Sequence, residues 1–211
     1  MSPTPDAGRI HGLYVIIDPD ACGGRSPVDV TRAALEGGAS MIQWRDKRRD
    51  KGDQLADARA IRALCRDHGA MFIANDHIDL AIALHADGVH LGQHDLPIDV
   101  ARPIAGDAMI IGASTNNVDE AHAAEAAGAD YVAVGAIFAT ASKDVTRPAN
   151  VERLREIKSA VRLPVVAIGG INASNIAQVV EAGADAAAVI GAVCGAVDVR
   201  SAAAELAAAF R

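Results

Sequence analysis

Short apolar runs rich in valine, isoleucine and alanine alternate along the chain with longer stretches in which small aliphatic residues recur every three or four positions. The short runs predict buried strands, and the longer stretches predict amphipathic helices, of which 51–68 and 118–127 have the clearest helical period. The predicted strands are eight in number and cover residues 13–18, 41–47, 71–76, 88–93, 109–114, 131–138, 164–169 and 186–190.

Several helical stretches end at a glycine and lead within one or two residues into the next strand, as at 36–40, 127–130 and 181–185. Glycine after the last helical turn is a common C-cap, and its recurrence indicates a repeated strand–helix unit. Eight such units predict the α/β class and a single (β/α)8 TIM barrel. An open doubly wound sheet is the competing architecture, but segment 18–24 has neither the GxGxxG loop nor the P-loop lysine that such a sheet would carry. No linker divides the sequence, so residues 1–211 are predicted to form one domain.

Composition and charge narrow the class of protein. Hydrophobic residues make up 51% of the 211 residues, but the longest apolar stretch, 186–197, is shorter than the roughly 20 residues that cross a bilayer. The first residues lack the apolar core of a signal peptide, and three well-separated cysteines are typical of free thiols in a reducing compartment. We therefore expect a cytoplasmic protein with no membrane partner. A net charge of −7 also argues against nucleic acid as a partner, while the question of a homo-oligomer stays open.

Polar residues gather where the predicted strands end, which is where a barrel of this class has its active site. In the second strand, alternation aims Gln43, Arg45 and Lys47 to one face. Two cations beside an amide suit an anion pocket. The alternative is a solvated run of charge that continues into Arg48 and Arg49.

Carboxylates end the third strand and follow the fourth. Asp76 comes directly after Asn75, and Asp95 follows the next strand along the chain. Two carboxylates at neighbouring strand ends suit Mg²⁺, which binds through one or two protein carboxylates together with substrate phosphates. The alternative is that both aspartates cap the helices that follow them. Nearby histidines, His90 among them, lack the spacing and the cysteine partners of a zinc site.

The later strand ends carry hydroxyls, a lysine and glycines. Glycines after the seventh and eighth strands would let backbone amides reach a phosphate, the recurrent phosphate site of barrels. We expect no covalent catalysis, because the sequence offers Ser114 no evident histidine base and Lys143 lies in a polar loop. The candidate phosphate-binding residues in this part of the chain are Ser114, Thr140, Ser142, Lys143, Gly170, Ile190 and Gly191.

Taken together, the motifs QWRDK, Asn75-Asp76, GVHLGQHD, GAST, GAIFATASK and IGGIN resemble, in order and spacing, the thiamine-phosphate synthase family. The resemblance covers almost the whole chain. It implies a (β/α)8 barrel that joins hydroxymethylpyrimidine diphosphate to a thiazole phosphate with Mg²⁺, releasing pyrophosphate. It further implies that the diphosphate leaves first and that a pyrimidine-stabilised carbocation is captured by the thiazole nitrogen.

The resemblance also implies a role for each matching residue. The Mg²⁺ ligands would be Asp76 and Asp95, and Gln43 would contact the pyrimidine. The thiazole phosphate would lie against Thr140, Ser142 and the Gly170 region, with Ile190 and Gly191 at the last strand. The diphosphate contacts would be Arg45, Lys47, Asn75, Ser114 and Lys143, four of which (Arg45, Lys47, Ser114 and Lys143) would act in catalysis.

Some positions depart from the family pattern. Ala136 and Ala139 replace two prolines of the sixth-strand loop, and Ser142 replaces a threonine, which predicts a less rigid loop with its donors retained. Trp44 stands where the family more often has Leu or Phe, and Asn116 stands where family members often have His. Both departures bear on the shape of the pocket. Two rival functions remain. A related thiazole tautomerase would need a histidine where Asn116 stands, and a non-catalytic barrel that binds a phosphorylated ligand would not need both metal ligands and leaving-group contacts.

Overall fold

A closed ring of parallel strands forms the centre of the molecule. The computed structural model describes residues 7–139 and 148–211. Within them each strand pairs in parallel with the next, and the last pairs with the first, as Gly12 does with Ala186. The prediction of a (β/α)8 barrel is confirmed. The strands are β1 (Gly12–Ile17), β2 (Met41–Trp44), β3 (Met71–Asn75), β4 (Gly88–Leu91), β5 (Ile110–Thr115), β6 (Tyr131–Val134), β7 (Val165–Ile168) and β8 (Ala186–Val189).

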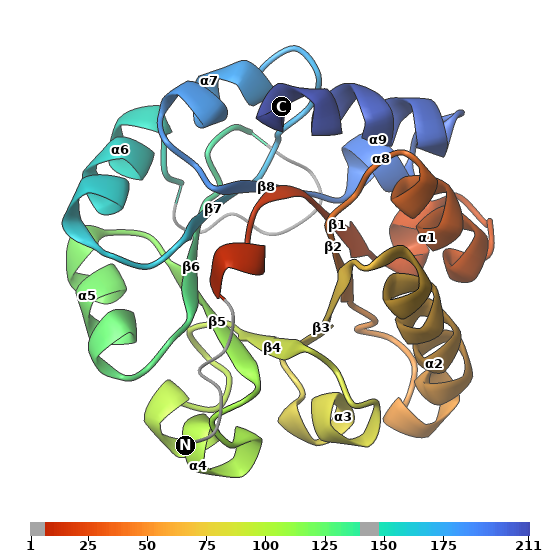
Figure 1. Ribbon diagram of the computed structural model, residues 1–211, viewed down its shortest axis with the longest axis horizontal. Coiled ribbons are helices and arrows are strands. Elements are labelled where there is room, and N and C mark those ends of the chain that lie inside the picture. The colour runs from red at the N-terminus through yellow and green to blue at the C-terminus, as the bar shows by residue number, and fades with distance from the viewer. Residues whose placement is uncertain (1–6, 140–147) are drawn as a thin grey trace.

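The helices surround this ring, as Figure 1 shows down the barrel. The described residues also contain three short 3-10 helices, η1 (Ala7–Arg9), η2 (Pro19–Cys22) and η3 (Ala208–Phe210). The α-helices of the described residues are α1 (Pro27–Glu36), α2 (Lys51–His68), α3 (Ile78–Ala83), α4 (Ile98–Ala105), α5 (Val118–Ala126), α6 (Val151–Ala160), α7 (Ile176–Glu181), α8 (Gly191–Cys194) and α9 (Val199–Ala207). No helix in the described part of the chain is long and apolar enough to cross a membrane.

The sequence placed several strand ends too late. The run predicted over 131–138 is a strand only to Val134, and the one predicted over 41–47 ends at Trp44. In the described residues between Trp44 and α2, only the Arg45 amide still donates to β1, at the carbonyl of Ile17, and the polar residues that follow belong to the loop before α2. Helix α2 has the predicted bounds, and α5 ends one residue earlier than predicted.

Alternation along each strand divides the core in two. Leu13, Val15 and Ile17 of β1 pack outward against the helices. Tyr14 and Ile16 of the same strand point into the barrel with an inner cluster that includes Met71 and Val166. Ile10, which follows η1, also belongs to this inner cluster, and Figure 1 shows η1 across the centre of the barrel. The amino-terminal end of the barrel is therefore filled, and a binding site is left to the other end.

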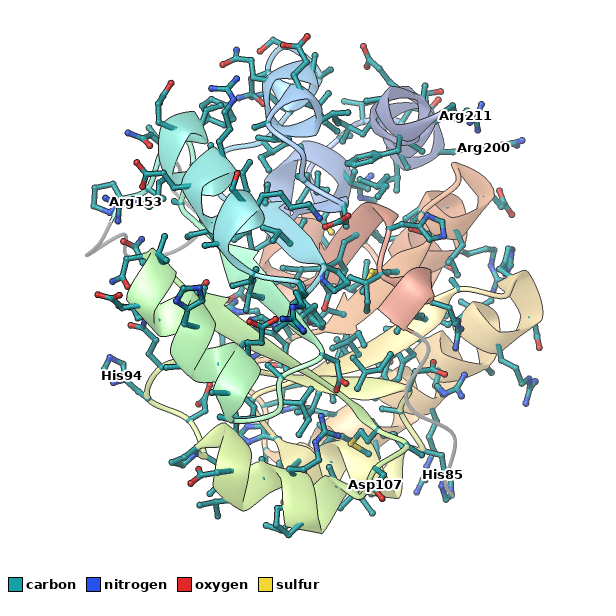
Figure 2. The ribbon with its side chains drawn as sticks, turned by 60° about the vertical axis from the view of Figure 1, so that its left-hand side comes forward. His85, His94, Asp107, Arg153, Arg200 and Arg211 are labelled. Carbon is teal, nitrogen blue, oxygen red and sulfur yellow. The ribbon has the colours of Figure 1, made fainter. Side chains whose placement is uncertain are left out.

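The two ends of the barrel can be told apart in Figure 2. His94, in the loop after β4, and Arg153, near the start of α6, lie at the edge where the carboxyl ends of the strands open. His85, in the loop before β4, lies with Arg211 toward the opposite edge. The loops that carry the predicted chemistry belong to the first of these edges.

Candidate active site

A cavity of about 760 Å³ opens at the carboxyl ends of the strands. Of the predicted site residues, Thr140, Ser142 and Lys143 lie outside the described residues. The structure brings all the others together around this cavity, so their shared location follows from the fold while their individual roles stay predictions. The predicted residues that line it are Gln43, Arg45, Lys47, Asn75, Asp76, Asp95, Ser114, Gly170, Ile190 and Gly191.

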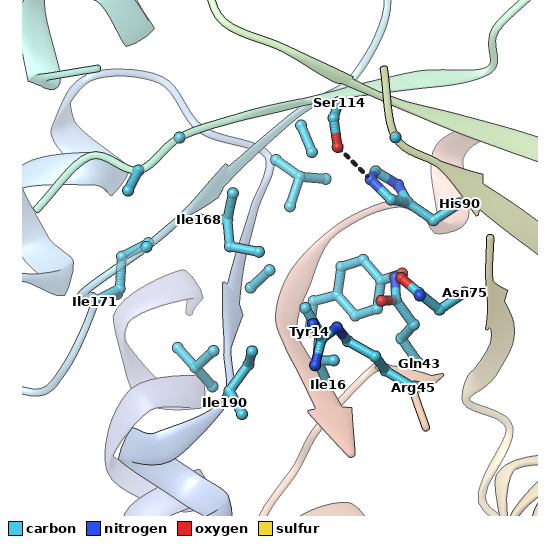
Figure 3. Close-up of a pocket in the computed structure, with 18 of the residues that line it drawn as sticks. Tyr14, Ile16, Gln43, Arg45, Asn75, His90, Ser114, Ile168, Ile171 and Ile190 are labelled. Carbon is cyan, nitrogen blue, oxygen red and sulfur yellow. Dashed lines mark hydrogen bonds between the residues drawn. The ribbon is translucent and has the colours of Figure 1, made fainter. Parts of the chain in front are cut away.

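The cavity has one polar and one apolar side. Figure 3 shows Gln43, Arg45 and Asn75 gathered beside Tyr14, with Ile168, Ile171 and Ile190 across the cavity from them. The polar side chains come from β2, β3 and the loops after them, whereas the isoleucines come from the ends of β7 and β8. Such a cavity suits a ligand with a charged or hydrogen-bonding part and an apolar part.

Arg45 is held by a carboxylate that sequence reasoning missed. Its Nη1 forms an ion pair with Oδ2 of Asp18, at the end of β1, and the two side chains are only 18% and 12% exposed. The alternative of a solvated charge run fits Arg48, which is 77% exposed and pairs with Asp20, but does not fit Arg45. The sequence could have indicated this partner, because Asp18 is a carboxylate directly after β1, the strand that pairs with β2.

Trp44 lies outside the cavity, on the helix-facing side of β2. It is 1% exposed, and its indole Nε1 donates to Oε1 of Gln54 at 3.1 Å. The Gln54 amide in turn donates to the backbone oxygens of Asp46 and Arg49. The expectation that Trp44 alters the pocket is therefore wrong, because this side chain instead ties the loop that follows β2 to α2.

Asp76 and Asp95 both line the cavity, and each carboxyl shifts the pKa of the other. Lys47 Nζ donates to Oδ2 of Asp76 at 2.5 Å, and the amide of Gly92 donates to Oδ2 of Asp95 at 2.7 Å. Burial alone would raise the pKa of Asp76, but the hydrogen bonds from Lys47 and Asp95 outweigh it and lower that pKa. Burial raises the pKa of Asp95, against the Gly92 amide and together with the neighbouring Asp76.

Neither aspartate caps a helix. The N-cap of α3 is His77 and that of α4 is Pro97, so the capping alternative fails for Asp76 and Asp95. Asp76 has a left-handed backbone, with φ of 60°, and its amide donates to the carbonyl of His90. Its side chain lines the cavity. Across the described residues, no group of three or more His, Cys, Asp or Glu side chains is arranged to hold a metal ion, so a cation here would depend on this pair.

Ser114 has a histidine beside it, contrary to the expectation from the sequence. Its Oγ lies 3.0 Å from Nε2 of His90, as the dashed line in Figure 3 marks. The other ring nitrogen of His90, Nδ1, lies 2.9 Å from the hydroxyl of Tyr131. The third group is thus a phenol, not the carboxylate that orients the histidine of a Ser-His-Asp triad.

Backbone amides are available where the seventh and eighth strands end. Gly170 has a φ of 65°, and a Cβ there would lie 2.4 Å from the carbonyl oxygen of Ala139, so no side chain fits. Among the described residues, the amides of Gly170 and Gly191 donate to no other backbone group. Both line the cavity, and free amides at a glycine-rich turn suit an anionic oxygen.

Asn116 also lines the cavity, with its side-chain amide donating to the carbonyl of Gly135 at 3.2 Å. Its backbone amide donates to Oε2 of Glu120 in α5. An amide held in this way can orient a ligand but has no proton to exchange near neutral pH.

Comparisons with known proteins agree with this geometry. Residues 13–193 match the family model described as thiamine monophosphate synthase. Thiamine-phosphate synthase of Moorella thermoacetica is 51% identical over 195 residues, covering 92% of this chain and 93% of that protein. That of Methanoculleus marisnigri is also 51% identical, over 197 residues and 93% of each chain. The solved thiamine phosphate pyrophosphorylase of Pyrococcus furiosus superposes with a TM-score of 0.89 at 42% identity, covering 96% of both chains.

Proposed function

Because this chain belongs to the thiamine-phosphate synthase family of enzymes, we propose that it couples hydroxymethylpyrimidine diphosphate to thiazole phosphate, giving thiamine phosphate and pyrophosphate. The observation that carries the proposal is the two-sided cavity, which combines cations, paired carboxylates and free amides at one end of the barrel. We further propose that residues 1–211 act as one domain in the cytoplasm, with these two small molecules as partners.

The polar side would receive the pyrimidine diphosphate. Gln43 would contact the pyrimidine, and Arg45, Lys47, Asn75 and Ser114 would contact the diphosphate, joined by Lys143. Charge on the departing oxygen grows as the C–O bond breaks, and fixed cations stabilise that state more than the ground state. The pairing of Arg45 with the buried Asp18 supports this role, because it holds the guanidinium in place before the ligand arrives.

Mg²⁺ fits the donor set at the rim. Two neighbouring carboxylates at the cavity, one of them with its pKa raised beside the other, form a site where a divalent cation would relieve repulsion. Asp76 and Asp95 would hold the ion, and when bound it would supply charge neutralisation to the diphosphate oxygens. Lys47, already 2.5 Å from Asp76, would then be released toward the diphosphate.

The thiazole phosphate would occupy the opposite side. Its phosphate would lie on the amides of Gly170 and Gly191, with Thr140 and Ser142 as further contacts, and its ring would lie against Ile168, Ile171 and Ile190. This arrangement points the thiazole nitrogen across the cavity to the pyrimidine.

The reaction would proceed without an activated nucleophile. The C–O bond to the diphosphate breaks first, and its electron pair leaves on the diphosphate oxygen. The lone pair of the thiazole nitrogen then forms the new C–N bond, and no proton is transferred in either step. Holding the two partners in line therefore supplies most of the catalysis asked of the protein.

A coupled assay tests the proposal. Purified protein given both precursors and Mg²⁺ should release pyrophosphate and form thiamine phosphate, and omission of either precursor should stop the release. Isomerisation of a thiazole tautomer, with no pyrophosphate under any metal condition, would replace the synthase with the tautomerase. Binding of either phosphorylated precursor without any turnover would favour the non-catalytic barrel.

A further inference from the structure

A chain of hydrogen bonds runs through the barrel interior beneath the cavity. Gln43 Nε2 donates to the hydroxyl of Tyr14 at 2.7 Å, and this hydroxyl lies 3.2 Å from that of Tyr131. The Tyr131 hydroxyl lies 2.9 Å from His90 Nδ1, and His90 Nε2 lies 3.0 Å from Ser114 Oγ. These five side chains, here called the interior relay, come from β2, β1, β6, β4 and β5 in that order.

The interior relay is tightly packed. Gln43, Tyr14 and Tyr131 are 2%, 1% and 0% exposed. The Tyr131 ring stacks on His90 with centroids 5.5 Å apart, and it lies so close over Gly112 that a Cβ there would be 2.0 Å from Tyr131 Cζ. Tyr131, at the middle of the relay, does not line the cavity, so its hydroxyl depends on its two neighbours for hydrogen bonds.

The proton order along the relay has one consistent direction. Each phenol has a single O–H, and either tyrosine hydroxyl could donate to the other; because Tyr14 accepts from Gln43, the order used here has its own proton going to Tyr131. In the same order the Tyr131 proton goes to His90 Nδ1, and the His90 ring N–H is on Nε2, donating to Ser114. The Ser114 hydroxyl accepts this bond, and its own proton is left to donate into the cavity.

We infer that the interior relay is a positioning network that couples the two ends of the polar side of the cavity. At one end the Gln43 amide oxygen is set as an acceptor, and at the other end the Ser114 hydroxyl is set as a donor. A ligand that donates to Gln43 and carries an anion to Ser114 stabilises the same proton order at both ends. Tyr14, Tyr131 and His90 are thus positioning residues. The assignment of a pyrimidine amino group and a diphosphate to these ends rests on the proposed function, whereas the direction of the relay does not.

Reversing one end tests the direction. Gln43→Glu is nearly isosteric, and its ionised carboxylate can only accept, so the Tyr14 proton would turn toward it and every later bond would reverse. Nitrogen-15 NMR of the histidine rings at pH 8.5 should show the His90 proton on Nε2 in the unaltered protein. In Gln43→Glu the proton should move to Nδ1, although two tyrosines separate the residues. The carboxyl carbon shift of the introduced side chain reports its ionisation, and pH is raised until it is ionised.

A second experiment removes the Tyr131 hydroxyl, at the middle of the interior relay. Tyr131→Phe should leave His90 with mixed tautomers that no longer respond to Gln43→Glu. It should also lower kcat about tenfold, because one oriented hydrogen bond is lost, while the KM for thiazole phosphate stays within about twofold of its original value. Thr31→Val is the matched control, because it removes a buried hydroxyl that donates to Pro27 far from the cavity. It should change neither the His90 signals nor kcat.

The outcomes separate the two proposals. An unchanged His90 tautomer with the Gln43→Glu side chain ionised, or an Nδ1 proton in the unaltered protein, would overturn the relay. If the His90 tautomer reverses in Gln43→Glu but the unaltered protein releases no pyrophosphate, the relay is supported and the proposed function is refuted. Equal kinetic losses in Tyr131→Phe and Thr31→Val would reduce Tyr131 to a structural role and overturn its positioning role.

Discussion

The close approach of two loops at Gly170 yields the sharpest quantitative prediction. A Cβ there would lie 2.4 Å from the Ala139 oxygen and 2.8 Å from Cβ of Phe138, whereas ordinary contact begins at 3.4 Å. In Gly170→Ala the segment with Phe138 and Ala139 must therefore move by about 1 Å, and a misplacement of that size can cost up to about a hundredfold in rate. We expect kcat/KM for thiazole phosphate to fall between tenfold and a hundredfold, roughly, in Gly170→Ala.

Gly69 provides a matched control. Its φ of 69° is close to the 65° of Gly170, but no atom lies within 4 Å of its added Cβ. Gly69→Ala thus carries the left-handed backbone penalty alone, about 1 kcal/mol, and should lower Tm by about 2–4 °C in a chain of this size. Its kinetics should be unchanged because Gly69 ends α2, away from the cavity.

The comparison isolates the loop contact. Thermal melts and pyrophosphate release at varied thiazole phosphate are measured for both variants. In Gly170→Ala the overpacking adds about 1–3 kcal/mol of destabilisation if the loop resists, and the rate falls if the loop yields. A Gly170→Ala protein that matches Gly69→Ala in both Tm and kcat/KM would refute the reasoning. The close approach of Phe138 and Ala139 to Gly170 would then not require a glycine.

Four further substitutions test residues proposed to act at the site. Asp76→Asn and Asp95→Asn should each lower Mg²⁺-dependent turnover by about a hundredfold or more. Their thermal melts should stay close to those of the unaltered protein, because both carboxylates lie at the rim of the cavity. Full activity of either variant at low millimolar Mg²⁺ would show that its carboxylate does not bind the metal. Lys143→Ala should lower kcat more than it raises the KM for thiazole phosphate, since a cation at the leaving group acts most as charge develops; a change confined to that KM would assign Lys143 to the other phosphate. Asn116→Ala should slow coupling only about tenfold, as expected of an amide that orients a ligand, and abolition of turnover in a folded protein would show that Asn116 has a larger part.

Much of the fold could be predicted because strand and helix periods differ so clearly in this chain. Even β8, with the sequence AAAV, was found within the predicted run 186–190. Strand ends were harder to place, because residues such as Arg45 and Lys47 keep facing the cavity after β2 has left the ladder at Trp44. Side-chain direction alone could not separate the end of a strand from the start of a loop.

The location of the candidate site could be predicted, but its internal contacts could not. Strand ends of a closed barrel meet at one rim, so polar residues at several strand ends had to come together. The pairing of Arg45 with Asp18 depends on side-chain conformation, and two adjacent cations gave no sign of which would be held by a carboxylate. Alternation places Tyr14 and Tyr131 inside the barrel. Their contact spans 117 residues, however, and depends on the height of each strand in the closed ring.

The serine and histidine at the cavity show why contact alone does not define a mechanism. In a hydrolase triad the third group is a carboxylate, which stabilises the imidazolium that forms when histidine takes the proton of serine. Here the third group is the Tyr131 phenol, whose pKa burial raises well above its ordinary value, so it remains neutral and offers no negative charge to an imidazolium. His90 is therefore suited to donate to Ser114 rather than to deprotonate it. The proposed coupling, in which the leaving group departs first, needs a donor at the departing oxygen and no activated nucleophile, and the Ser114 hydroxyl would supply that donor.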